Sequence, residues 1–186
     1  MKLCFMDVET TGTDPKVHAV IQVAGIILSK GHEQEFTFNL KPFKGDLISK
    51  YALDVNRLSI EKLETFEEPK KIYGALTNIF RTYVDPYNKG DKMFFVGYRA
   101  DFDYNFMRAF WEKNDDKYFG SYFWYPPIDL MPICAIRMMA DRPRMPNFKL
   151  GTVANALGLG YREEDAHNAL YDVKITRALY EVMRQV

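Results

Sequence analysis

Residues 5–12 are Phe5-Met6-Asp7-Val8-Glu9-Thr10-Thr11-Gly12, and the other candidate catalytic groups of the chain make sense as partners of its two carboxylates. This stretch includes the end of an apolar run, Leu3 to Met6, that predicts a short buried strand, and Thr10-Thr11-Gly12 is typical of a turn. Asp7 and Glu9 are therefore expected where the strand ends. Side chains two residues apart in an extended backbone point to the same side, so the two carboxylates should lie together. Adjacent carboxylates repel each other unless a cation or a proton intervenes, although two solvated acids would be the simpler interpretation of this pair alone.

Length and composition limit the class of protein. The chain has 186 residues, of which 47% are hydrophobic, and this suits a single domain over residues 1–186 with a substantial core. No apolar run approaches the roughly 18 residues of a membrane span, and Asp7 comes too early for the apolar centre of a signal peptide. Cys4 and Cys134 lie in apolar segments, as reduced cysteines do. We expect a soluble, cytoplasmic protein with no membrane partner, no disulfide and no zinc site.

The charge balance limits the way in which nucleic acid could be bound. There are 25 basic and 25 acidic residues, so the formal net charge is zero. A protein that holds long nucleic acid along its whole surface needs an accumulated basic footprint, which this chain does not have. A short end could still be held locally, because aromatic residues make up 15% of the chain and unstacked bases bind to aromatic faces. Most of the aromatic side chains are nevertheless expected in the core.

The hydrophobic pattern predicts a mixed α/β architecture. Residues 19–28 and 35–40 are expected strands joined by a turn, so that with the first strand they form an antiparallel meander. Pro69 begins a helix, and the continuously apolar residues 92–97 predict a central fourth strand. The expected pattern therefore changes from a meander to strand-helix-strand crossovers.

The second half of the chain is expected to be mainly helical. We predict helices over residues 99–111, over 149–157 and from about 166 to 184, besides a short capped helix over 59–63. A brief fifth strand is predicted at residues 128–130, and a helical segment follows it through residue 139. Residues 118–127 are aromatic and poor in helix formers, which predicts a crowded loop packed against the core rather than a platform for stacked bases.

Three further residues occupy informative positions. Asp103 falls at the start of a helix that follows a central strand, where acids are also common for electrostatic reasons alone. His167 and Asp172 are five residues apart, which places them on well-separated sides of an ideal helix. They can share a target only if His167 lies in the preceding loop or first turn. Without such a target, His167 would be an ordinary surface residue.

Together these residues resemble the motifs of the DEDD exonucleases in their histidine-bearing form, DEDDh. Asp7-Val8-Glu9-Thr10-Thr11-Gly12 resembles the first motif, Phe102-Asp103 the end of the second, and His167-x4-Asp172 the third, in the order that the family has. Residues 52–56 and 149–158 also resemble segments of the proofreading subunit of bacterial replicative polymerases and its DnaQ-like relatives. The second motif usually contains His-Asn where this chain has Tyr98-Arg99, which puts local packing and substrate contacts in question.

The resemblance implies a fold, an activity and a set of roles. The fold would be RNase H-like α/β, a five-stranded mixed sheet that combines the meander with the crossovers and has helices around it. Two divalent cations, Mg²⁺ or Mn²⁺, would be held by the hard oxygen donors of Asp7, Glu9, Asp103 and Asp172. His167 would be the general base for the attacking water. The implied reaction is 3′-to-5′ exonuclease cleavage that releases nucleoside 5′-monophosphates.

The substrate and its contacts are less closely defined. The resemblance implies that the terminal nucleotide is contacted by Thr10, Thr11 and Gly12. Phe102 is a candidate for base stacking or for the core. Basic candidates for phosphate contacts, each equally able to be solvated, are Arg99, Arg142, Arg144 and Lys149.

The leading hypothesis is hydrolysis of single-stranded DNA or frayed duplex ends at the 3′ terminus. A 3′-to-5′ exoribonuclease or oligoribonuclease is the alternative with the same chemistry. A catalytically silent nucleic-acid-binding module of the same fold is an alternative from another class, and the intact set of acids with His167 argues against it. The chain is expected to act as a monomer or a homodimer.

Overall fold

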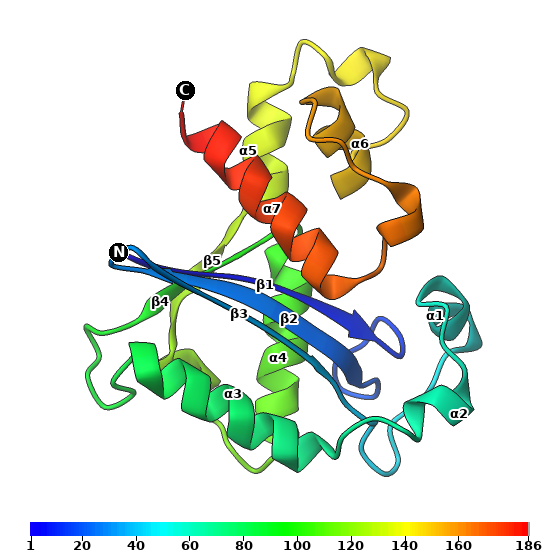
Figure 1. Ribbon diagram of the computed structural model, residues 1–186, viewed down its shortest axis with the longest axis vertical. Coiled ribbons are helices and arrows are strands. Elements are labelled where there is room, and N and C mark those ends of the chain that lie inside the picture. The colour runs from blue at the N-terminus through cyan, green and yellow to red at the C-terminus, as the bar shows by residue number, and fades with distance from the viewer. Residues whose placement is uncertain (186) are drawn as a thin grey trace.

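A computed structural model describes residues 1–185, and its centre is a five-stranded mixed sheet with the strand order β3-β2-β1-β4-β5 (Figure 1). Strands β1, β2 and β3 form the predicted antiparallel meander, and β4 and β5 run parallel to β1. The strands are β1 (Lys2–Thr10), β2 (Val20–Ser29), β3 (His32–Asn39), β4 (Met93–Gly97) and β5 (Phe123–Asp129). The combination of meander and crossovers predicted from the sequence is confirmed.

Helices cover both faces of the sheet (Figure 1). Helices α3 (Pro69–Tyr83) and α4 (Ala100–Lys113) lie on one face, and α5 (Leu130–Arg137), α6 (Leu150–Ala156) and α7 (Ala169–Arg184) lie on the other. Two short helices, α1 (Lys50–Val55) and α2 (Ile60–Leu63), lie beyond the end of β1. The 3₁₀ turns are η1 (Phe119–Ser121), η2 (Arg142–Arg144) and η3 (Glu163–Asp165). No helix in residues 1–185 is both long enough and apolar enough to span a membrane.

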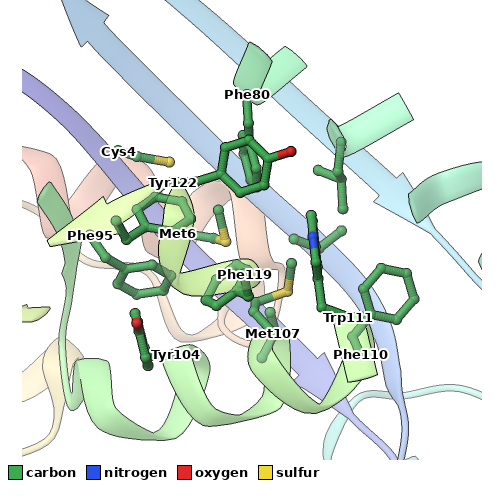
Figure 2. Packing of buried hydrophobic residues seen from close by; sticks show 14 of the residues in the cluster. Cys4, Met6, Phe80, Phe95, Tyr104, Met107, Phe110, Trp111, Phe119 and Tyr122 are labelled. Atoms are coloured by element: carbon green, nitrogen blue, oxygen red, sulfur yellow. The ribbon is translucent and has the colours of Figure 1, made fainter. Parts of the chain in front are cut away.

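The side chains of β1 alternate between two hydrophobic cores. Cys4, Met6 and Val8 point into the core beneath α3 and α4, and Leu3 and Phe5 point into the core beneath α7. The first of these cores is rich in aromatic residues. Figure 2 shows Trp111 among the buried rings there, and its ring is nearly parallel to that of Phe80 at a centroid distance of 5.6 Å. The alternation decides which face of the sheet each later residue of β1 joins.

Residues 118–127 differ from the predicted loop. They form η1 and most of β5, which extends over Phe123–Asp129, so the predicted strand at 128–130 is only the end of a longer one. Because β5 is an edge strand, it can contain Pro126 and Pro127 without breaking a central ladder. The predicted packing against the core is correct, since Phe119 and Phe123 are buried.

Two element boundaries affect the candidate site. β1 continues to Thr10, so Asp7 and Glu9 lie within the strand. The sequence had predicted that the strand ends where these two residues begin. β4 pairs with β1 only from Leu3 to Phe5. The last helix begins at Ala169 and not near residue 166, which leaves His167 in the preceding segment, as a shared target with Asp172 requires.

Candidate active site

The side chains of Asp7 and Glu9 continue the β1 series that begins with Leu3 and Phe5, and so they emerge on the face covered by α7. Asp7 lies opposite Ala24 of β2 in the antiparallel ladder, and Glu9 lies opposite Gln22. A bulge follows Glu9 and ends the regular pairing. The strand therefore delivers both carboxylates to the same face, as their spacing predicts.

Asp103 reaches the same place from the first turn of α4. Its Oδ1 accepts a hydrogen bond from the backbone N–H of Val8 at 3.1 Å, and the side chain is 4% exposed. This N–H is available because β4 no longer pairs with β1 beyond Phe5. Asp103 thus satisfies a buried donor that the sheet leaves unpaired.

Asp172 and His167 come from the start of α7. Asp172 is buried in the helix, whereas His167 lies just before the N-cap Asn168 and has a left-handed backbone with φ of 62°. The segment is fixed to the sheet by Gln22, whose Oε1 accepts a hydrogen bond from the N–H of Ala169 at 2.8 Å. The helix start is thereby placed beside Glu9, which lies opposite Gln22.

All five motif residues line one cleft of about 220 Å³, the acidic cleft. Within it, one oxygen from each of Asp7, Glu9 and Asp172 lies within 4.8 Å of the other two. The lining consists of Asp7, Val8, Glu9, Tyr98, Arg99, Phe102, Asp103, His167 and Asp172. A second cleft, of about 750 Å³, shares Tyr98, Arg99, His167 and Asp172 with the first. The two clefts therefore adjoin each other at these four residues.

Burial and mutual repulsion disfavour ionisation of the acids. Burial raises the pKa of Asp7 well above its usual value, and the carboxylates of Asp103, Glu9 and Asp172 raise it further. Burial, with a contribution from Asp172, raises the pKa of Glu9 to about 8. Burial raises the pKa of Asp103 well above its usual value, against the hydrogen bond from Val8.

The pKa values of Asp172 and His167 are shifted in opposite directions. Burial raises the pKa of Asp172 to about 6, although hydrogen bonds from Tyr161 and from the His167 backbone lower it. His167 is exposed, yet partial desolvation lowers its pKa, and the nearby charge of Arg57 acts in the same direction. The lowered pKa favours the neutral imidazole of His167, the state in which it can accept a proton.

The donor set fits hard divalent cations. Four carboxylates from β1, α4 and α7 line one cleft, and the neighbours that act on their pKa values are other carboxylates and hydrogen-bond donors. Such a cluster is fully ionised at neutral pH only with bound cations, and all-oxygen ligands favour Mg²⁺ or Mn²⁺ over softer metals.

The Thr10-Thr11-Gly12 turn lies outside the lining of both clefts. Thr11 is fully buried, and its hydroxyl donates to the carbonyl of Leu47 at 2.7 Å and accepts from the N–H of Ala19 at 2.9 Å. The hydroxyl of Thr10 donates to the carbonyl of Gly12 at 2.6 Å. Both hydroxyls thus have partners within the fold.

The other predicted substrate residues divide into two groups. Phe102 lines the acidic cleft, Lys149 lines the larger cleft and Arg99 lines both. Arg142 and Arg144 are outside both linings. The guanidinium of Arg142 lies 5.6 Å from the centre of the Phe148 ring, and Arg144 forms an ion pair with Asp141.

The Tyr98-Arg99 pair, which departs from the motif, has specific contacts. The hydroxyl of Tyr98 donates to the carbonyl of Phe148 at 2.7 Å and so attaches the loop before α6 to the end of β4. Arg99 has a left-handed backbone with φ of 61°, and its N–H donates to Asp129 Oδ1 at 2.9 Å. Left-handed backbone is costly for arginine and readily adopted by asparagine, the usual residue of the motif here.

Three residues near the site are not identified by the motifs. Tyr161 donates a hydrogen bond to Asp172, and Gln22 holds the start of α7. Arg57 donates from Nη1 to the carbonyl of Glu164 at 2.8 Å and from Nη2 to that of Glu163 at 3.3 Å. Gln22 is a polar interruption of an apolar strand and could have been noticed from the sequence; Tyr161 and Arg57 carry no comparable signal.

Comparisons with known sequences identify relatives over almost the whole chain. The family model described as Exonuclease (RNase_T) matches residues 4–180. Ribonuclease T of Buchnera aphidicola subsp. Baizongia pistaciae is 27% identical over 185 residues, which cover 94% of this chain and 80% of that protein. The DNA polymerase III PolC-type of Thermotoga petrophila is 25% identical over 187 residues, which cover 97% of this chain and 12% of the polymerase.

A comparison with solved structures identifies the fold. The crystal structure of E. coli exonuclease I in complex with a dT13 oligonucleotide superimposes with a TM-score of 0.77 and 21% identity. The match covers 98% of this chain and 41% of that one, so this chain spans less than half of exonuclease I. The fold is the RNase H-like α/β fold predicted from the sequence.

Proposed function

Since this chain belongs to the exonuclease family and is a DnaQ-like 3′-to-5′ exonuclease, we propose that it hydrolyses the 3′ ends of single-stranded DNA or frayed duplexes. The observation that carries the proposal is the convergence of Asp7, Glu9, Asp103, His167 and Asp172 on one cleft. The products of this reaction are nucleoside 5′-monophosphates. Residues 1–186 are proposed to form one exonuclease domain.

The carboxylates of Asp7, Glu9, Asp103 and Asp172 are the proposed ligands of two divalent cations. When bound, Mg²⁺ or Mn²⁺ would supply charge neutralisation at the scissile phosphate and at the departing 3′ oxygen. The protein contributes rigid placement of the ligands. Asp103 is fixed by Val8 at 3.1 Å, and Asp172 is fixed by Tyr161 at 3.2 Å.

His167 is the proposed general base. His167 and Asp172 both line the acidic cleft, and the lowered pKa of His167 favours the neutral imidazole that can take a proton from the attacking water. The left-handed backbone of His167 is the kind of local strain that accumulates at functional positions.

The substrate strand is proposed to enter through the larger cleft. Arg99 and Lys149 line it and offer positive charge to backbone phosphates, while Phe102 in the acidic cleft offers a ring to the terminal base. Thr10, Thr11 and Gly12 are also proposed to contact the terminal nucleotide, although the hydroxyls of both threonines and the backbone N–H of Thr11 already have partners within the fold. Arg142 and Arg144 are proposed to contact phosphates farther from the 3′ end.

RNA is the second candidate substrate, because relatives named ribonuclease T match 94% of the chain. The choice between RNA and DNA depends on whether a 2′-hydroxyl is accommodated near the terminal nucleotide. The catalytically silent alternative is disfavoured by the complete set of acidic residues and histidine. A monomeric or homodimeric state and a cytoplasmic location stay predictions.

The test uses single strands of DNA and of RNA with the same base order, labelled at either end, in Mg²⁺ or Mn²⁺. Cleavage from the 3′ end releases a 3′ label at once as a mononucleotide and converts a 5′-labelled strand into a ladder of shortening products. Relative rates on the two polymers decide the substrate class. If the wild type releases no mononucleotide from either polymer, or if Asp7→Asn leaves the rate unchanged, the proposed mechanism is wrong.

A further inference from the structure

Tyr161 touches a proposed cation ligand although it belongs to none of the three motifs. Its hydroxyl donates a hydrogen bond to Asp172 Oδ1 at 3.2 Å, and its ring lines the larger cleft. It lies on the segment between α6 and His167, eleven residues before Asp172 along the chain. One side chain thus joins the segment that carries the proposed base to a ligand on α7.

The local backbone is shaped to place this ring. Gly158 and Gly160 both have left-handed backbones, with φ of 74° and 67°, and turn the chain back towards α7 after α6. A Cβ on Gly151 would lie only 2.5 Å from Tyr161 Cε1, so the absence of a side chain there lets the ring lie directly on α6. The ring also packs against that of Tyr171, with centroids 5.4 Å apart. Tyr161 therefore has a defined orientation.

Asp172 needs such a partner because its neighbours repel it. Its carboxylate, Asp7 and Glu9 each place an oxygen within 4.8 Å of the others, an arrangement that favours rotation of a side chain away from the group when no cation is present. The hydrogen bond from Tyr161 holds one oxygen of Asp172. Because a phenol is uncharged, it provides this support without competing with a cation for the carboxylates, as a lysine or arginine would.

We propose that Tyr161 is a positioning residue, which holds Asp172 in the orientation needed to share a divalent cation with Asp7 and Glu9. This inference rests on the proposed function, because it takes the three carboxylates as cation ligands. Partners of metal ligands commonly change metal affinity by about 10–100-fold when removed. The hydroxyl of Tyr161 should therefore affect cation affinity more than binding of the nucleic acid.

The test compares Tyr161→Phe with Tyr171→Phe. The first variant removes the hydroxyl at Asp172 but keeps the ring on Gly151. The second removes a neighbouring hydroxyl that accepts a hydrogen bond from the N–H of Arg162 at 2.7 Å and has no hydrogen bond to Asp172. Mn²⁺ binding to each substrate-free protein is measured by electron paramagnetic resonance and calorimetry. Steady-state rates at saturating Mn²⁺ then give KM for an oligonucleotide.

Tyr161→Phe is expected to bind Mn²⁺ about 10-fold or more weakly than the wild type, with KM for the oligonucleotide unchanged. Tyr171→Phe should bind Mn²⁺ like the wild type. Equal Mn²⁺ affinity of Tyr161→Phe and wild type, or equal weakening by both variants, would overturn the role of Tyr161. A wild type that neither binds Mn²⁺ nor cleaves either polymer would instead overturn the proposed function on which the inference rests.

Discussion

The two halves of β1 have opposite characters. From Leu3 to Phe5 the strand pairs with β2 on one edge and β4 on the other, and its side chains are buried and apolar. From Asp7 to Thr10 the ladder continues only with β2, and the side chains facing α7 are carboxylates. The alternation of side chains is the same in both halves, so Asp7 continues the row of Phe5.

The difference shows how a stable sheet can present a reactive edge. Where β4 stops pairing, the N–H of Val8 becomes available, and Asp103 of α4 takes it. Acids can then approach the strand from elements on both faces. The first half of β1 contributes mainly to stability, whereas the second half lowers stability through buried and mutually repelling carboxyls.

One substitution in each half of β1 tests this contrast most strongly, because the two should have opposite effects on stability. Asp7→Asn should lower the rate about 10³-fold or more, because a cation ligand is lost, yet raise the melting temperature of the cation-free protein by relieving repulsion. Phe5→Ala should instead lower stability by about 3–5 kcal/mol, because its side chain is fully buried. Exonuclease rates and thermal unfolding in EDTA measure the two effects. A cation-free Asp7→Asn protein less stable than the wild type would contradict the contrast.

Removal of the proposed base should affect turnover next most. His167→Ala is expected to lower kcat by about 10²–10⁴-fold. The lowered pKa of His167 means that the wild-type rate rises with pH through a value below 6.5, as the imidazole loses its proton, and the variant should lack this limb. His32→Ala, at the exposed start of β3, is the control. An unchanged pH-rate profile in His167→Ala would exclude the role of base.

Asp103 of α4 binds the second half of β1 through Val8, and its substitution should affect both stability and activity. Asp103→Ala leaves the N–H of Val8 without its acceptor and should cost about 1–3 kcal/mol in the free energy of unfolding. Asp103→Asn keeps an oxygen for that N–H and should retain stability, while both variants lose activity. Urea unfolding of the two proteins measures the difference. Equal stability would show that the Val8 contact adds nothing to the fold.

Cations and pH should change the stability of the protein through the carboxyls of the site, in the second half of β1 and on α7. Burial raises the pKa to about 6 for Asp172 and to about 8 for Glu9, above the unfolded values of about 4. The folded protein therefore retains protons that the unfolded chain releases, and stability in EDTA should fall as pH rises from about 4 to about 8. Mn²⁺ at pH 8 should restore several degrees of melting temperature. A flat pH dependence in EDTA would contradict the raised pKa values.

Substitution of Arg99 should have the smallest effects on stability and on KM. Arg99→Asn replaces a left-handed arginine with a residue that adopts this backbone readily, and should stabilise the protein by up to about 1 kcal/mol. Loss of the charge should raise KM for the oligonucleotide about fivefold, equivalent to about 1 kcal/mol of phosphate interaction. Arg99→Lys retains the charge and serves as the control. A KM unaffected by Arg99→Asn would remove this residue from the substrate path.

The sequence predicts those parts of the molecule that depend on local periodicity. The spacing of Asp7 and Glu9 places them on one face, and the spacing of His167 and Asp172 requires a helix that begins between them. The Val8 contact of Asp103 is not predictable in this way, because it depends on where β4 stops pairing. Tyr161 is equally hidden, since its contact with Asp172 depends on the path of the turn between α6 and η3.

Other differences arise from tertiary context. Residues 123–127 contain aromatic residues and two prolines, which predict a loop, but an edge position lets them form part of β5. Thr11 looks available for a ligand in the sequence, whereas folding directs its hydroxyl to Leu47 and Ala19. Local chemistry identifies the reactive residue types, and tertiary contacts decide which of their atoms are free.

The hydrogen bonds of Arg57 should affect local unfolding near the site. Its guanidinium binds the carbonyls of Glu163 and Glu164, and the neighbouring Asn56 side chain donates to the carbonyl of Thr10 at 3.0 Å. The turn between α1 and α2 is therefore attached both to the segment that precedes His167 and to the end of β1. Because these hydrogen bonds link the segments, local unfolding of one segment should favour unfolding of the other. We therefore expect the amide hydrogens in residues 49–58 and 160–168 to exchange with solvent as one cooperative unit. A bound strand that contacts only His167 would slow exchange in both segments.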